Sequence, residues 1–478
     1  MIDHQEVMDF SREFGLGPHV IEKDYVLGWI LAGIANHAAI NTTWVFKGGT
    51  CLKKCFFETY RFSEDLDFTI TKTANLDQDF LKTTFSEIVD WVYGETGIEI
   101  PSDRLRFDVY DNPRGKQAIE GRIYYRGPLQ RRGDMARIKL DISNDEILVL
   151  DAVHREVHHP YSDRPVDGIH ILSYCFEEVF AEKIRALGER ERPRDLYDVV
   201  HLYRHDDMRP DRDLVKNTLQ QKCEFKGVDV PTMGALEDSP NKAELIGEWE
   251  NMLAHQLPAL PPFEDFWNEI PEVFSWLHEA TEKVAPTPFP SRTTEEDDWR
   301  PPRMGTAWRM TAPLEIIRFA AANRLCVKLG YKGSFRLIEP YSLRRTKDNN
   351  ILLHAVRHET GAPRSYRVDR IQSAEATKTT FKPRYEIELA ATGPLSTPPI
   401  SRQSGIQRVS RSGGVKTFSS LPSRRRRPLS QGPTYVIECP YCRKRFYRKK
   451  SGTRLNKHKD KHGYPCSGRI GHQVDVRY

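Results

Sequence analysis

Asp65 and Asp67 stand one residue apart at the start of the apolar stretch DLDFTI. Alternate residues of a β-strand point to the same face of a sheet, so we expect both carboxylates on one face. Carboxylate oxygens are ligands of Mg²⁺ in sites that also bind phosphates. A metal held there can bridge the phosphates of a nucleoside triphosphate and stabilise in-line attack at the α-phosphorus. The pair therefore predicts a metal site for phosphate chemistry, and an ordinary surface strand with alternating acids is the alternative.

The glycine pair Gly48-Gly49, followed by Thr50, precedes the two aspartates by the length of a short helix. Glycine leaves the backbone N–H groups uncovered, and the first turn of a helix favours phosphate. We therefore expect these three residues to line a triphosphate. Three further candidates lie near the aspartates in the sequence or on another predicted strand: Arg61 and Ser63 as contacts to nucleotide or metal-bound water, and Asp141 as a third carboxylate.

Hydrophobic periodicity indicates the elements that must position these residues. Apolar residues recur at helical spacing in segments 19–35, 50–60, 173–190 and 194–205, and strands are expected at 44–49, 65–70 and 137–143. In the last of these, Ile138, Leu140 and Ile142 alternate with polar residues. Mixed helices and strands of this kind predict an α/β (α+β) domain whose C-terminal part is helical.

The composition excludes several classes of protein. Of the 478 residues, 38% are hydrophobic and 29% charged, and no apolar run of about 18 residues could span a membrane. The N-terminus MIDHQEVMDF lacks a signal pattern, so we expect a cytoplasmic protein without a membrane partner. Eight cysteines are too few for a disulfide framework in so long a chain.

The charge is unevenly distributed. Residues 401–478 carry 20 lysines and arginines against three acids, a balance of +17, and subtraction from the total of +5 leaves −12 for residues 1–400. Dense cationic charge most often neutralises phosphates, so a nucleic-acid contact is expected at the C-terminus. A solvated basic tail is the alternative.

Composition also predicts where the domains end. We expect a transferase-like α/β domain over 1–285, a Pro-rich charged linker over 286–305, and a small β-rich domain over 306–392. That domain would hold a helix at 312–324 and strands at 325–331, 351–358, 364–371 and 384–389. A disordered basic linker over 393–433 and a cysteine-containing module over 434–478 would follow.

Three segments resemble one enzyme family. KGGTCLKKCFFETYRFSEDLDF (47–68) is similar to motif I of the AbiEii-type nucleotidyltransferase toxins, a branch of the polymerase-β-like nucleotidyltransferase superfamily. EEVFAEKIRALGERERPRDLYDVVHLY (177–203) is similar to the later signature of that family, and VIEKDYVLGWIL (20–31) resembles its opening helix. The motifs appear in the family's order and span roughly residues 15–280.

The resemblance implies roles for particular residues. Asp65 and Asp67 would be the metal ligands, Lys183 would neutralise the triphosphate, and Asp198 with Asp195 would complete the site. Lysine suits this role because it offsets the charge that builds on the leaving pyrophosphate. The alternatives are an exposed Lys183 without a role in catalysis and an Arg194–Asp195 ion pair that fixes the start of a helix.

The resemblance also implies the reaction. Members of the AbiEii-type family transfer nucleotides from an NTP to an RNA acceptor, with tRNA 3′ ends as the known substrate class. They act as toxins of toxin–antitoxin pairs in phage defence by abortive infection. Mg²⁺, an NTP, RNA and an antitoxin protein are the implied cofactor, substrates and partner. The competing class is a nucleic-acid-binding defence regulator whose transferase fold has lost its activity.

Residues 334–371 resemble the WYL domain, a small Sm-like β-barrel of bacterial defence regulators. The segment departs from the name-giving tripeptide, because Ile351-Leu352-Leu353 replaces Trp-Tyr-Leu. The functional interpretation is phosphate recognition by guanidinium groups and a tyrosine, namely Arg364, Tyr366, Arg367 and Arg370. Strand alternation favours a different interpretation, with Tyr366 in the core and Arg367 on a solvated face.

The tail carries a metal-binding pattern whose first half is Cys439 and Cys442 at C-x₂-C spacing. The second half is His458 with either His462 or Cys466. We favour Cys466, because YPCSGR can present a thiolate as CPYC does and the pattern resembles short zinc-ribbon tails. So small a module needs Zn²⁺ to fold. The neighbouring RKRFYRKK interleaves aromatic and basic residues, a pattern suited to RNA binding.

Overall fold

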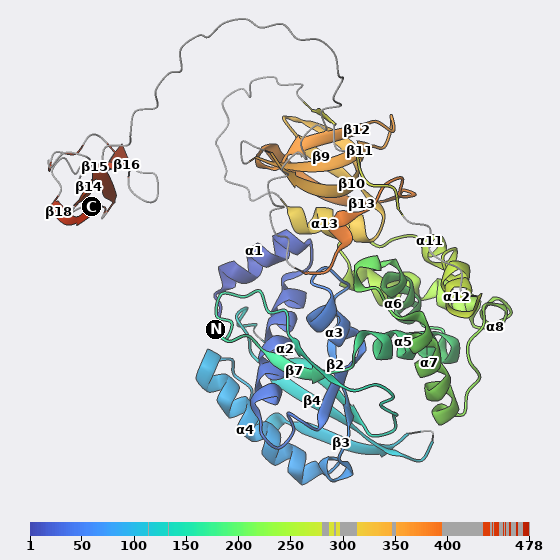
Figure 1. Ribbon diagram of the computed structural model, residues 1–478. Helices are drawn as coiled ribbons and strands as arrows, with labels where there is room; N and C mark the ends of the chain where they lie inside the picture. The colour runs from blue at the N-terminus through green and yellow to red at the C-terminus, as the bar shows by residue number, and fades with distance from the viewer. Residues whose placement is uncertain are drawn as a thin grey trace, which may run out of the picture. The chain divides into compact units, whose positions relative to one another are not determined.

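Figure 1 shows a computed structural model of the chain. The residues that it describes are 1–112, 114–131, 133–279, 286–290, 293–296, 313–346 and 350–393, and in the tail 434–439, 442, 444–448, 453, 455, 458–459, 465–466 and 472–477. They belong to two units, Met1–Gln403 and Ser404–Tyr478. Within these residues no helix is long and apolar enough to cross a membrane.

A seven-stranded mixed sheet forms the centre of the first unit, with strand order β3-β4-β5-β2-β1-β7-β6. The strands are β1 (Trp44–Lys47), β2 (Asp65–Ile70), β3 (Arg106–Asp111), β4 (Gln117–Tyr125), β5 (Ala136–Ser143), β6 (Val153–Glu156) and β7 (His170–Ser173). β2 runs antiparallel to β1 and parallel to β5. The predicted alternation in β5 is confirmed, since Ile138, Leu140 and Ile142 are buried.

Helices cover this sheet and continue beyond it. They are α1 (His4–Phe14), α2 (Pro18–Asn36), α4 (Gln78–Thr96), α5 (Phe176–Arg190), α6 (Pro193–Arg204), α7 (Arg212–Lys226), α8 (Met233–Glu237), α9 (Lys242–Gly247), α10 (Trp249–Leu253), α11 (Phe263–Trp267) and α12 (Ile270–Glu279). α2 is buried along most of its length and contacts α4 and β7. Helices α5 to α12 gather to one side of the sheet, which confirms a helical C-terminal part (Figure 1).

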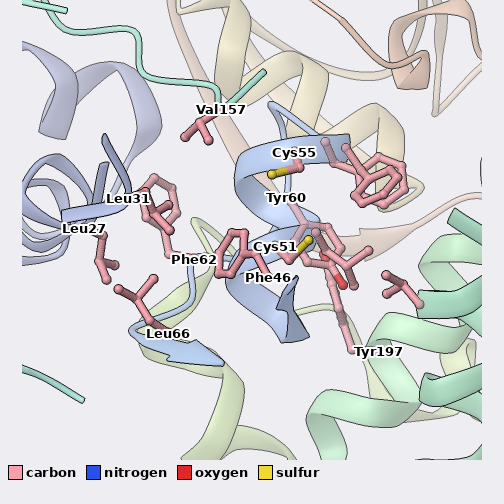
Figure 2. Close-up of a cluster of buried hydrophobic side chains, with 14 of the residues drawn as sticks. Leu27, Leu31, Phe46, Cys51, Cys55, Tyr60, Phe62, Leu66, Val157 and Tyr197 are labelled. Carbon is pink, nitrogen blue, oxygen red and sulfur yellow. The ribbon is translucent and has the colours of Figure 1, made fainter. Parts of the chain in front are cut away.

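A short helical run connects the two motifs of the candidate site. α3 (Gly48–Cys51) continues directly into a π-helix, η1 (Leu52–Phe56). The predicted helix thus ends four residues early, because Phe57 takes an extended conformation with φ −126° and ψ 108°. The side chains of Phe46, Cys51, Cys55 and Leu66 belong to one buried cluster around this run (Figure 2).

The rest of the first unit is a helix, α13 (Leu314–Ala322), and a six-stranded sheet of order β13-β9-β10-β11-β12-β8. The strands are β8 (Thr294–Glu295), β9 (Leu325–Tyr331), β10 (Ser334–Arg345), β11 (Ile351–Arg357), β12 (Pro363–Arg367) and β13 (Ile371–Thr380). β8 lies within the predicted linker and pairs with β12.

One predicted strand of this domain is wrong. Residues 384–389 form no strand, and a 3₁₀ turn, Glu388–Ala390, stands there. β10 and β13 are not among the predicted strands, and β13 is a polar segment that the apolar pattern did not indicate. Its pairing with β9 supplies backbone hydrogen bonds that its side chains do not predict.

The second unit has a small three-stranded sheet, β15-β14-β18, and a two-stranded one, β16-β17. The strands are β14 (Thr434–Glu438), β15 (Arg445–Arg448), β16 (His458–Lys459), β17 (Pro465–Cys466) and β18 (His472–Arg477). Its core contains Ile437, Cys439, Leu455 and Cys466. The predicted disordered segment from 394 to 433 lies outside the described residues, as do 291–292 and 297–305 of the predicted first linker.

Candidate active site

The glycine turn and the aspartate strand touch each other directly. Gly48 has φ +81°, and a Cβ there would lie 2.9 Å from Cγ of Asp67 and closer still to Oδ2. A Cβ at Gly49 would lie 2.6 Å from a guanidinium nitrogen of Arg61 and 3.1 Å from Oγ of Ser63. Both predicted glycines are therefore required by close approach, and Gly48 also by its left-handed backbone conformation.

Thr50 joins the two motifs by a hydrogen bond. Its hydroxyl donates to the backbone carbonyl of Asp65, and the residue is 1% exposed. The side chain is thus used to hold the start of β2 against the first turn of α3. The sequence predicted that Thr50 lines the phosphates, and this geometry leaves its backbone N–H, in the first turn, as the group suited to that role.

Three aspartates share one region of the sheet. Asp67 lies opposite Asp141 in the β2–β5 register and opposite Lys47 in the β1–β2 register. Burial, Asp141 and Asp65 raise the pKa of Asp67 to about 6, although Lys47 and Lys183 oppose the increase. The pKa of Asp141 is raised by burial and by Asp65, against the effect of Lys139, which donates to it at 3.0 Å.

This donor set fits a divalent cation. Half-buried carboxylates that repel one another gain from a positive ion between them, and oxygen donors suit Mg²⁺. Among the described residues, the one cluster of at least three side chains whose donor atoms already lie close enough to share a metal ion is in the tail. Asp65 and Asp67 on one strand are therefore the principal ligands to consider, with Asp141 beside them.

Lys183 projects from α5 toward these acids and is 7% exposed. Its ammonium lies 2.8 Å from Oδ2 of Asp198 and 3.4 Å from Oδ1 of Asp195. The alternative of an exposed lysine is wrong, because the ammonium is held in place by two carboxylates. The positive charge of Lys183 also lowers the pKa of Asp67, against the larger effect of burial.

Asp198 and Asp195 lie beneath the site rather than at its surface. Asp198 is 0% exposed and accepts from Arg61 at 2.7 Å on both oxygens, from Lys183 and from the hydroxyl of Tyr60. Burial alone would raise the pKa of Asp198, but Arg61 and Lys183 hold it well below its usual range. Its carboxylate is therefore ionised and fully engaged.

Asp195 pairs with Arg190, at 2.7 and 2.8 Å, and with Lys183. Asp195 thus forms its ion pair with Arg190 and not, as the alternative interpretation held, with Arg194. The negative charges that act most strongly on Arg194 are those of Asp65 and Glu64. Both helices that carry the later signature meet through these pairs.

Arg61 supports the glycine turn from behind. It is 2% exposed, pairs with both oxygens of Asp198 and donates to Oε1 of Gln256 at 3.0 Å. The burial places its guanidinium inside the protein, next to Gly49. The guanidinium of Arg61 therefore supports the turn at which the nucleotide is expected to bind, and a direct contact between Arg61 and the nucleotide stays a prediction. Ser63 is half-buried beside Arg61.

Lys47 is the residue near the site that sequence reasoning missed. It ends β1 directly before Gly48, and its ammonium lies 3.8 Å from Glu146 and 3.7 Å from Glu182. Burial would lower the pKa of Lys47, but Glu182, Glu146 and Asp67 raise it, so the residue is a fixed cation. The available signal was a lysine at the end of a strand immediately before two glycines.

A cavity of about 940 Å³ lies away from the aspartates. It is bordered by residues 54–58, at the C-terminal end of the helical run, and by residues 155–170. None of the predicted site residues lines it. The chemistry of the carboxylates, and not this cavity, therefore locates the candidate active site.

The arginines of the WYL-like segment lie close to acidic side chains of the same chain. Arg364 lies 3.5 Å from Glu296, Arg370 lies 3.6 Å from Glu295, and Arg367 pairs with Asp369 at 2.8 Å. Tyr366 is fully buried. The interpretation from strand alternation is confirmed for Tyr366, and each of the three arginines has an acidic neighbour.

In the second unit, Cys439, Cys442, His458 and Cys466 bring their donor atoms within 4.8 Å of one another. Sγ of Cys439 lies 3.7 Å from Sγ of Cys466, and Sγ of Cys442 lies 3.3 Å from Nε2 of His458. Two thiolates bound at about 2.3 Å to a tetrahedral Zn²⁺ would lie roughly 3.8 Å apart, so the set fits a zinc-ribbon-like tail. His462, the alternative ligand, lies outside the described residues.

Comparison with known proteins identifies two parts of the chain. The family model of the nucleotidyl transferase AbiEii toxin of type IV toxin–antitoxin systems matches residues 29–272, and that of the WYL domain matches 313–376. A comparison with curated proteins finds no match.

Solved structures give similarities at low identity. MenT4, a nucleotidyltransferase toxin of Mycobacterium tuberculosis H37Rv, is 16% identical over 57% of this chain and 89% of its own, with a TM-score of 0.39. JHP933 of Helicobacter pylori is 17% identical over 55% of this chain and 94% of its own, with a TM-score of 0.36. Because the AbiEii model covers just over half of the 478 residues, the chain belongs to the AbiEii family of toxin nucleotidyltransferases and also contains a WYL domain.

Proposed function

We propose that this chain is a Mg²⁺-dependent cytoplasmic enzyme that transfers nucleotides from an NTP to the 3′ end of an RNA, with tRNA as the acceptor class. We further propose that it is the toxin of a toxin–antitoxin pair in phage defence. The observation that carries the reaction is the meeting of three elements: the Gly48 turn touches Asp67, and Lys183 reaches the same place from α5. The family itself implies a nucleic-acid substrate and an antitoxin partner.

Each residue has a distinct part in this proposal. Gly48, Gly49 and the N–H of Thr50 bind the triphosphate at the first turn of the helical run. Asp65 and Asp67 would hold Mg²⁺, which would supply charge stabilisation on the phosphates. Lys183, fixed by Asp195 and Asp198, is a preorganised cation for the charge that develops on the pyrophosphate.

Asp141 is the candidate acceptor for the proton of the attacking hydroxyl. It lies beside Asp67 on the neighbouring strand, where Lys139 donates to it at 3.0 Å.

We assign the transferase to residues 1–285, a linker to 286–305, the WYL domain to 306–392, a second linker to 393–433 and a Zn²⁺ module to 434–478. The tail would deliver RNA to the transferase, because β15 carries Arg445 and Arg448 beside aromatic residues. Removal of residues 401–478 should weaken RNA binding and flatten its dependence on salt. Unchanged affinity and slope would exclude this role.

The reaction is tested with purified protein, labelled NTPs, Mg²⁺ and total tRNA. We expect one NTP to label RNA, and we expect Asp65→Ala to abolish the labelling. Asp90→Ala is the matched control, since Asp90 is an exposed aspartate of α4. Absence of labelling with every NTP would favour the inactive regulator, and equal labelling by Asp65→Ala would place the chemistry elsewhere.

A further inference from the structure

A short segment, residues 57–62, follows the helical run of the glycine turn and precedes β2, the strand of the aspartates. Successive residues of this segment are held by two different parts of the chain. Tyr60 and Arg61 bind Asp198 of the transferase signature. Glu58 and Thr59 instead contact α13, the helix at the start of the WYL domain.

The contacts to α13 are specific and partly buried. The hydroxyl of Thr59 donates to Oε2 of Glu315 at 3.0 Å, and the guanidinium of Arg318 donates to Oε2 of Glu58 at 3.3 Å. Arg318 is 3% exposed and also donates to the carbonyls of Ala391 and Gly393. Because its other donors are anchored in the WYL domain, Arg318 offers Glu58 a fixed partner.

A second contact joins Asn323, the C-cap residue of α13, to the helix that carries Asp195 and Asp198. The hydroxyl of Tyr197 donates to Oδ1 of Asn323 at 2.9 Å, and Nδ2 of Asn323 donates to the carbonyl of Phe319 at 3.0 Å. The donor role of the amide nitrogen fixes its oxygen as the acceptor for Tyr197. Both residues are buried, at 2% exposure or less.

Tyr197 continues this contact toward the site. Its ring lies 5.9 Å from that of Tyr60, whose hydroxyl donates to Asp198. Asp198 in turn binds Lys183 at 2.8 Å. Figure 2 shows Tyr60 and Tyr197 in the buried cluster that also contains Cys51 and Phe46 of the motif region.

We propose that α13 of the WYL domain is part of the active-site framework, and that Asn323, Glu315 and Arg318 are positioning residues for nucleotide transfer. They act through the 57–62 segment and Tyr197, which together set the places of Asp65, Asp67 and Lys183. The transferase site is then incomplete without the first helix of the WYL domain. This inference rests on the proposed function.

Steady-state kinetics of full-length variants test the proposal. We expect Asn323→Ala and Tyr197→Phe each to lower kcat by about tenfold with KM for the NTP within about twofold, since small displacements in a site strongly reduce the rate. The double variant should lose no more than the worse single variant, because both remove one interaction. Glu375→Ala, on the exposed face of β13, is the control and should match the wild type.

Hydrogen–deuterium exchange of the same proteins gives a readout that does not need activity. We expect faster exchange of the backbone amides of residues 57–68 in Asn323→Ala and in Tyr197→Phe, which lacks a single oxygen and is the variant expected to keep its fold. Faster exchange throughout the chain would mean a structural role alone and overturn the proposal. Unchanged kcat or unchanged local exchange in both variants would also overturn it.

The two levels of inference fail in different ways. If the wild-type protein transfers no nucleotide, the proposed function fails, and exchange in residues 57–68 still tests whether α13 holds the segment. If the wild type is active and both variants retain full kcat, the positioning role fails while the proposed function stands.

Discussion

Gly48 and Asp67 lie so close together that a side chain at position 48 would displace the side chain of Asp67. A Cβ on Gly48 would lie 2.9 Å from Cγ of Asp67. Because of this contact, the turn proposed to bind phosphate cannot move without displacing the strand proposed to bind the metal.

We expect Gly48→Ala to abolish nucleotide transfer and to destabilise the fold by about 1–3 kcal/mol, since φ +81° strains any side chain and the new methyl group displaces Asp67. Gly94→Ala, at a helical glycine where a Cβ meets nothing within 4 Å, is the control. It should leave activity intact and stabilise slightly. Retained transfer by Gly48→Ala would contradict the assigned contact.

Asp198→Asn should be strongly destabilising, because it leaves Arg61 and Lys183 buried with a neutral partner. Breaking a buried ion pair costs about 3–5 kcal/mol, which denaturant unfolding measures. Asp108→Asn, in an exposed pair with Arg122, is the comparison and should lower the free energy of unfolding far less, because solvent screens an exposed pair. Similar losses for the two variants would show that the Asp198 network is not buried in solution.

The aspartate cluster predicts how stability depends on pH. The folded-state pKa of Asp67 is raised to about 6 from 3.8 by burial, Asp141 and Asp65, against Lys47 and Lys183. A raised carboxyl pKa means that the folded state binds a proton more tightly than the unfolded state. Stability from this group is therefore present at low pH and lost as pH rises from about 4 to 6.

Mg²⁺ should reverse that loss by neutralising the carboxylates. We expect thermal unfolding to show a larger increase in Tm on Mg²⁺ addition at pH 7.5 than at pH 5, and Asp67→Asn to remove the difference. An equal increase at both values of pH, or one that persists in Asp67→Asn, would place the Mg²⁺ effect at another site.

The tail cluster predicts one Zn²⁺ per chain by metal analysis. Cys442→Ser and His458→Ala should lower the zinc content, and His462→Ala should not, because Cys466 completes the set. Cys175→Ser is the control, since serine is favoured at the helix N-cap that Cys175 occupies. Loss of zinc in His462→Ala with retention in Cys466→Ser would favour the other ligand set.

The motifs of the site could be predicted because each is short. GGT and DLD indicate their chemistry through spacing, the role of Lys183 follows from the family resemblance, and Cys466 lies in the cluster with Cys439, Cys442 and His458. The buried supports could not be found in this way, since Arg61 and Asp198 are 137 residues apart and Tyr197 and Asn323 are 126 apart. The sequence predicted a helix at 312–324 but not the surface against which it packs. β13 was missed because its stability comes from pairing with β9, which its polar sequence does not record.

The position of the label in the transferred group tests the central claim most directly. With the NTP that supports transfer, Mg²⁺ and tRNA, we predict that label in the α-phosphate becomes attached to RNA, whereas label in the γ-phosphate leaves with pyrophosphate. Asp67→Asn and omission of Mg²⁺ should each stop the transfer, while Asp90→Asn should not. RNA labelled from the γ-phosphate, or labelling from the α-phosphate that survives Asp67→Asn, would contradict nucleotidyl transfer at this site.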